Sequence, residues 1–150
     1  MASEHPAHTS QAGTHHILAD RYRAVRQMSE RLAAPLSVED MGLQSMEDAS
    51  PPKWHLAHVT WFFETFVLKP HLNGYEPLDP AYEALFNSYY NAVGPQFTRA
   101  HRGLLSRPSL GDVMAYRAHV DAAMDTLFKQ GLDDALEGLI TLGLNHEQQH

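Results

Sequence analysis

The histidines at positions 146 and 150 are the residues whose type and spacing best predict chemistry. Residues four apart lie on the same side of an α-helix, so both imidazoles can reach one metal ion. We expect the pair to point into the protein interior, where an unpartnered polar pair is costly and a shared metal ion would remove that cost. This expectation rests on the residues met in steps of three and four back from His146, which are Gly143, Leu139, Leu136 and Leu132.

A third ligand is expected near Trp54, where His55 and His58 are three residues apart. Both then lie on roughly the same side of a helix, so either can complete the site and spacing does not choose between them. The string His-Glu-x-x-His also matches zinc proteases, in which Glu147 would be the general base. We disfavour that interpretation because such enzymes usually take another ligand downstream and the upstream segments resemble a helical bundle. Glu147 is then a support for a ligand or a solvent-facing residue.

Composition narrows the function further. The chain has 150 residues with 11 basic and 18 acidic side chains, and its net charge of -7 argues against a nucleic-acid-binding protein. The absence of cysteine excludes disulfides, thiolate metal sites and a cysteine nucleophile, and it suits a cytoplasmic location. No apolar run is long enough to cross a membrane, and no secretory signal is visible. The densest basic stretch, residues 99–107, suits a small anionic ligand.

The chain divides into a leader and one helical domain. Residues 1–13 are expected to form a disordered leader, because they are rich in Ser, Thr, Ala and Gly. The domain is expected to occupy residues 14–150. Histidines of the leader region are therefore not expected to be ligands.

Four main helices are expected in the domain, with no convincing strand. The first covers residues 14–34, with an apolar stripe of Ile17, Tyr22, Val25, Met28 and Leu32. The second starts at Ser50-Pro51-Pro52 and is stopped by Pro70, the third starts at a capping box of Ser109 and Asp112 and ends at Gly131, and the fourth begins at Leu132. The core positions expected in the third helix are Val113, Tyr116, Val120, Met124 and Leu127.

A long connection joins the second and third of these helices. Residues 71–108 are punctuated by Pro and Gly, with a short helix expected within residues 81–90 and another short turn of helix at residues 37–46. Long ordered connections often carry binding groups. The fold class is therefore all-α, a four-helix bundle with a long crossover connection and metal ligands projecting inward from facing helices.

Four strings together resemble the ergothioneine-pathway sulfoxide synthases. They are SPPKWHLAHVTWFFE at residues 50–64, FNSYYNAVG at residues 86–94, RGLLSRP at residues 102–108 and HEQQH at residues 146–150. The resemblance runs from about residue 14 to the end. These strings are far more specific together than either histidine motif is alone.

The resemblance implies a DinB-like four-helix bundle that holds one non-haem Fe(II) ion through three histidines. In the Trp-x-x-x-His pattern of that family the last histidine is the ligand, which corresponds to His58; His146 and His150 correspond to the other two. Gln149 corresponds to a contact with the histidine-derived substrate. Arg99 and Arg102 are the nearest matches to arginines that bind the carboxylates of the thiol substrate.

The implied reaction is O2-dependent C–S bond formation in ergothioneine biosynthesis. A cysteine-type thiol (cysteine or γ-glutamylcysteine) is joined to the imidazole C2 of hercynine, with oxidation to a sulfoxide; related selenoneine synthases use a selenium donor. Family members carry a second domain, resembling formylglycine-generating enzymes, that supplies the catalytic tyrosine. We therefore expect this chain to be truncated, with no catalytic residue of its own and with little activity alone.

Two other classes stay open at this point. One is a DinB-like metal-binding module without oxidase chemistry, such as a thiol transferase. The other is a purely structural bundle. Metal binding separates the structural bundle from the other two hypotheses. Oxygen uptake with hercynine and a thiol separates the sulfoxide synthase from the metal-binding module.

Overall fold

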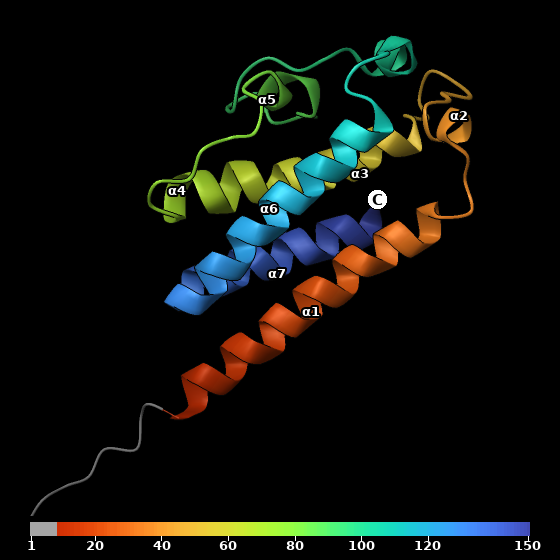
Figure 1. Ribbon diagram of the computed structural model, residues 1–150. Helices are drawn as coiled ribbons and strands as arrows, with labels where there is room; N and C mark the ends of the chain where they lie inside the picture. Colours follow the sequence, from red (N-terminus) through yellow and green to blue (C-terminus); the bar gives the residue numbers. More distant parts are fainter. Residues whose placement is uncertain (1–8) are drawn as a thin grey trace, which may run out of the picture.

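Four long helices packed side by side make up the domain (Figure 1). The computed structural model describes residues 9–150, and across that range it contains no strand beyond one isolated bridge. The expected all-α bundle with a long connection is confirmed. The long helices are α1 (Thr9–Ala33), α3 (Pro52–Phe62) with its continuation, α6 (Leu110–Gln130) and α7 (Asp134–Gln149). The short elements are α2 (Val38–Met41), the π-helix η1 (Phe63–Leu68), α4 (Lys69–His71), α5 (Tyr82–Leu85) and the 3₁₀-helix η2 (Arg99–Leu104).

Most helix boundaries follow from local capping chemistry. The Ser109 hydroxyl accepts from the amide of Asp112 and the Asp112 carboxylate accepts from the amide of Ser109, as predicted. Gly131, with φ of 88°, ends α6, and Asp133 caps α7 by accepting from the amide of Leu136.

Three boundaries differ from expectation. Helix α1 begins at Thr9, five residues before position 14, and residues 1–8 of the predicted leader lie outside the described residues. Pro51 rather than Ser50 occupies the cap position of α3. The second long helix continues through η1 and ends at His71, one residue after the Pro70 that was expected to stop it.

The apolar stripe expected in α6 is correct, since all five of its residues are buried. The stripe expected in α1 is only half correct. Tyr22 and Val25 are buried, but Ile17 is 71% exposed and Leu32 is 74% exposed. The buried face of α1 also includes Arg26, so apolar periodicity alone assigned the wrong register to that helix.

Hydrogen bonds from the two tryptophans of α3 hold the long connection against that helix. The indole of Trp54 donates to the carbonyl of Leu85 at 3.0 Å, and the indole of Trp61 donates to the carbonyl of Glu83 at 3.0 Å. Buried indole N–H groups require a partner, and here the partners are backbone oxygens of the connection. Further along the connection, Tyr89, Arg99 and Arg102 line one cavity with His150 at the end of α7. None of the helices in the described part of the chain is long and apolar enough to cross a membrane.

Candidate metal centre

The bundle brings His58, His146 and His150 together. One ring nitrogen from each lies within 4.8 Å of the others, and Nε2 of His58 is 3.2 Å from Nε2 of His146. His58 projects from α3, whereas His146 and His150 come from the last turn and the cap of α7. Three imidazoles converging on one point match the ligand set of a metal centre that keeps a position open for substrate.

His58 is neutral, with Nε2 as its unprotonated nitrogen. Its Nδ1 lies 2.6 Å from the carbonyl oxygen of Phe86, and a carbonyl only accepts, so Nδ1 carries the proton. The ring stacks on Trp54 at 4.6 Å and on Trp61 at 5.6 Å. Burial lowers the pKa of His58 to about 3. The lone pair of Nε2 is therefore available to a metal ion at neutral pH.

The two histidines of α7 lie at the rim of the bundle rather than in its interior. His146 is half-buried and His150 is exposed, whereas Glu147 between them is buried. The expectation that the pair points into the interior is therefore confirmed in part: Nδ1 of His146 is buried, whereas His150 is exposed. The buried stripe of α7 ends on Glu147, which follows Ile140 and Leu144 at helical spacing. A rim position suits ligands that must meet a substrate from solvent.

Close approach of α7 to the second long helix depends on Gly143. A Cβ at this position would lie 2.6 Å from Cε1 of Phe63. The glycine lets α7 lie against η1, one turn before His146. The His146 ring then rests 4.9 Å from that of Phe62, and its Nδ1 is buried without a hydrogen-bond partner in the described chain. Burial lowers the pKa of His146 to about 4, so this imidazole is also neutral.

His55 does not join the three-histidine cluster but touches it from outside. Its Nδ1 lies 2.9 Å from Nδ1 of His150, so one of the two nitrogens carries the proton between them. Burial lowers the pKa of His55 to about 4 and that of His150 in the same direction. The choice between His55 and His58 that spacing left open is thus made by position: His58 faces His146, and His55 braces His150.

A cavity of about 430 Å³ opens beside the cluster and contains the other expected binding residues. Gln149, Arg99 and Arg102 all line it together with the three histidines. Neither arginine forms an ion pair with a carboxylate among residues 9–150. Two unpaired guanidiniums in one cavity favour an anionic ligand.

Arg102 is the more rigidly held of the two arginines. Its side chain is buried over the Trp54 ring, with Cζ 3.6 Å from the ring centroid, and it donates to the Ser50 hydroxyl at 3.0 Å. Its Nε has no partner in the described chain. Burial, together with the neighbouring charge of Arg99, lowers the pKa of Arg102 to about 10, so it remains charged at neutral pH.

Comparison with known protein families agrees with this architecture. The sequence profile of the DinB superfamily matches residues 21–150, which is most of the chain. The chain belongs to the DinB superfamily. A search of curated proteins found no match. The matched range covers the second half of α1, all of α3, α6 and α7, the histidine cluster and the cavity, and it leaves the identity of the metal and the reaction open.

The donor set of this DinB bundle fits a divalent transition metal. Three neutral imidazoles suit zinc, copper, iron or nickel and do not suit magnesium or calcium, which prefer oxygen ligands. The absence of cysteine removes thiolate-selective metals from consideration. Nδ1 of His146 makes no hydrogen bond within the described chain, so no such bond holds it away from a metal ion.

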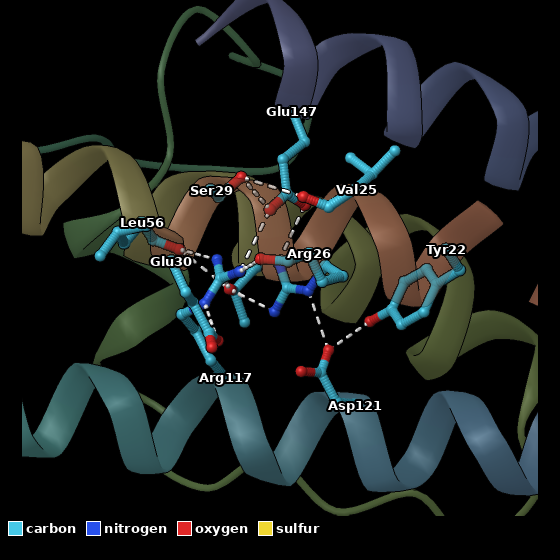
Figure 2. A network of polar contacts seen from close by, with 10 residues as sticks. Tyr22, Val25, Arg26, Ser29, Glu30, Leu56, Arg117, Asp121 and Glu147 are labelled. Carbon is cyan, nitrogen blue, oxygen red and sulfur yellow. Dashed lines mark hydrogen bonds and ion pairs between the residues drawn. The ribbon is translucent and has the colours of Figure 1, made fainter. Parts of the chain in front are cut away.

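Sequence reasoning missed the polar interior of this DinB bundle. Figure 2 shows the side chains of Arg26 and Arg117 converging on Glu147, and all three are buried. The available signal was positional: Arg117 follows the core residue Tyr116, and Arg26 follows the core residue Val25. Charged residues beside an apolar stripe usually face solvent, so only partners from other helices identify the exceptions.

The lowered histidine pKa values predict that the metal-free protein loses stability in mild acid. The unfolded chain binds protons near the ordinary histidine pKa of 6.5, whereas folded His58 binds one only near its pKa of about 3. The contribution of these neutral histidines to the free energy of unfolding is complete above about pH 6.5. It is lost as the pH falls towards their pKa values in the folded protein. Thermal unfolding followed by circular dichroism in EDTA, between about pH 7 and pH 5, measures this loss.

A histidine replacement separates this effect from general acid sensitivity. His58→Gln should show a shallower fall of Tm with pH than the unaltered protein. His71→Gln, which changes an exposed histidine of α4, is the matched control and should keep the full slope. Equal slopes in all three proteins would contradict the assignment.

Proposed function

We propose that this chain is the metal-binding part of a non-haem Fe(II) enzyme of ergothioneine biosynthesis. The proposed reaction joins the sulfur of cysteine or γ-glutamylcysteine to the imidazole C2 of hercynine. One O2 molecule is consumed: one oxygen atom becomes the sulfoxide oxygen, and the other leaves as water with the thiol and C2 hydrogens. The observation that supports the proposal is the three-histidine cluster at the edge of a cavity with two unpaired arginines.

Histidines and arginines of the cavity have different proposed roles. His58, His146 and His150 would hold the metal ion, which when bound supplies O2 activation and a site for the thiolate. Arg99 and Arg102 would bind the carboxylates of the thiol substrate, with Arg102 fixed by its stacking on Trp54. The remaining effect is positioning, since two substrates held beside one another react as if intramolecular.

Gln149 is proposed to orient hercynine. It is exposed on the last turn of α7 and lines the cavity between the two ligands of that helix. Its side-chain amide offers both donors and an acceptor, which complement the acceptor and donor nitrogens of a neutral imidazole ring. Hercynine binding, measured by calorimetry on metal-loaded protein, tests this role.

The role of Arg102 makes a quantitative prediction. Arg102→Met should weaken cysteine binding to the Fe(II)-loaded protein by about 10- to 100-fold, because a hydrogen bond to a charged group contributes about 1.5–3 kcal/mol. Anaerobic calorimetry measures this change. Arg107→Met removes the same charge from an exposed position outside the cavity and should bind cysteine as the unaltered protein does. Equal affinities in the two variants would remove Arg102 from the site.

Two alternatives use the same site. A selenium donor in place of the thiol would make the product selenoneine, and competition between the two donors decides that question. A DinB-like thiol transferase is compatible with the family match and the three histidines, and it requires neither iron nor O2. Oxygen consumption that depends on both hercynine and a thiol supports the oxidase; thiol-dependent chemistry without oxygen uptake supports the transferase.

A further inference from the structure

Two buried arginines each connect all four long helices. Arg26 projects from α1 and donates through Nε to Asp121 of α6 at 2.8 Å. It also donates through Nη1 to Glu147 of α7 at 3.0 Å and through Nη2 to the hydroxyl of Thr60 of α3 at 2.9 Å. Every nitrogen of this guanidinium therefore contacts a different helix.

Arg117 repeats the pattern from the opposite side. It projects from α6, and its Nε donates to Glu30 of α1 at 3.2 Å. Its Nη1 donates to the carbonyl of Leu56 at 3.2 Å and to the hydroxyl of Thr60 at 3.3 Å, both on α3. Its Nη2 donates to Glu147 at 3.2 Å. Figure 2 shows the two guanidiniums side by side beneath the Glu147 carboxylate.

The acceptors shared by the two arginines lie next to the metal ligands in the sequence. Glu147 directly follows His146 and precedes His150 by three residues. Thr60 follows His58 by two residues, and Leu56 precedes it by two. The arginines therefore hold α3 at both sides of its ligand and hold α7 between its two ligands.

We propose that Arg26 and Arg117 form a clamp that sets the axial register of α3 against α7, with Glu147 and Thr60 as positioning residues for the three-histidine cluster. The proposal deepens the proposed function, because it assumes that this cluster binds a metal ion. It specifies how Glu147 supports the ligands, through its ion pairs with both arginines and not as a general base. None of the clamp residues enters the metal site.

The physical reason for the clamp is that apolar packing is not directional. A helix rises 1.5 Å per residue, so a small axial shift of α7 would separate the imidazoles of His146 and His58, now 3.2 Å apart at Nε2. Hydrophobic contact resists such sliding only weakly, since it depends mainly on the area buried. A guanidinium presents its donors in a rigid fork, and two forks sharing the same acceptors admit one register.

Co²⁺ binding to Thr60 variants tests the clamp. Thr60→Val keeps the shape of the side chain but removes the acceptor used by both arginines. Groups that hold metal ligands in position typically contribute about 10- to 100-fold to metal affinity. We therefore expect Thr60→Val to weaken Co²⁺ binding by about 10-fold or more and to change the visible spectrum of bound Co²⁺. Thr60→Ser keeps the hydroxyl and should restore both the affinity and the spectrum.

Thr65 provides a matched control in the same continuous helix. Its hydroxyl oxygen is buried and has no hydrogen-bond partner among the described residues. Thr65→Val is therefore the same chemical change without a clamp contact, and it should leave Co²⁺ affinity and spectrum unchanged. Thr60→Val that binds Co²⁺ like the unaltered protein would overturn the proposal, as would an equal loss in Thr65→Val.

A second variant covers the case in which Thr60→Val does not fold. Ser29 donates to Glu147 at 2.8 Å from a half-buried position, so Ser29→Ala loosens the same carboxylate at a milder site. It should weaken Co²⁺ binding in the same direction but by less. Unchanged affinity in a folded Ser29→Ala protein, with Thr60→Val unfolded, would overturn the clamp.

A metal-free measurement separates the clamp from the metal proposal. Imidazole ¹⁵N NMR of the chelator-treated protein should show the resonances of His146 and His150 displaced in Thr60→Val and unchanged in Thr65→Val. If the unaltered protein binds no Co²⁺, the metal proposal fails while this measurement still decides the clamp. Undisplaced α7 imidazoles in Thr60→Val would overturn it.

Discussion

Replacing His58 with alanine is expected to weaken binding of a divalent transition metal by more than about 100-fold. Structural zinc sites with four ligands bind with about 10–16 kcal/mol, so one ligand contributes roughly 3 kcal/mol, which is about 100-fold in affinity. His58 is the ligand whose loss should matter most, because its Nδ1 hydrogen bond and its two tryptophan neighbours hold Nε2 in place before any metal arrives.

Anaerobic loading with Fe(II), followed by metal analysis after gel filtration, measures this loss. His146→Ala and His150→Ala should also bind less metal. His55→Ala is the matched control, because His55 is three residues away and contacts His150 rather than the centre of the cluster. We expect it to cause a much smaller loss. Normal iron content in His58→Ala, or an equal loss in His55→Ala, would contradict the three-histidine assignment.

Replacing Glu147 with alanine is expected to lower the free energy of unfolding by about 3–5 kcal/mol, the usual cost of removing one partner from a buried ion pair. The carboxylate is shared by Arg26 and Arg117, both buried, and it also accepts from Ser29. Burial alone would raise the pKa of Glu147, but the two guanidiniums and the Ser29 hydrogen bond together lower it below its ordinary value. The carboxylate is therefore ionised at neutral pH.

Urea unfolding of the metal-free protein, followed by circular dichroism, measures this cost. Working without metal separates the stability of the bundle from any contribution of the ligands beside Glu147. Gln148→Ala changes the exposed neighbour and should alter the free energy of unfolding by less than about 0.5 kcal/mol. A loss of less than about 1 kcal/mol in Glu147→Ala would show that solvent compensates the two arginines.

Local patterns predicted the elements of this bundle well. The capping pair of Ser109 and Asp112 and the stop at Gly131 are short-range interactions, and the structure contains both. The apolar stripe of α6 is correct because it is buried on one face along its whole length. These features depend on residues within a few positions of each other, which is the range that a single sequence reveals.

Polar burial was not predicted because its cause is not local. Arg26 and Glu147 look like surface residues in their own helices. Arg26 becomes stable in the interior only through acceptors on three other helices, and Glu147 only through donors on two. The registers of α1 and α7 were therefore assigned from apolar residues alone. In both helices a charged residue that is buried was therefore left out of the predicted core.

By itself, the sequence determined that two histidines share one side of the last helix and that a third donor follows Trp54. Those conclusions depend on helical periodicity alone. The family resemblance pointed to His58 as that donor, and the tertiary structure brings it to the pair. Only the tertiary structure decided that His55 contacts His150 and that Glu147 is buried. The reason is that residues three apart differ little in direction within one helix. Which of them meets a partner depends on the axial and rotational position of a second helix, and that position is set by contacts distant in the sequence.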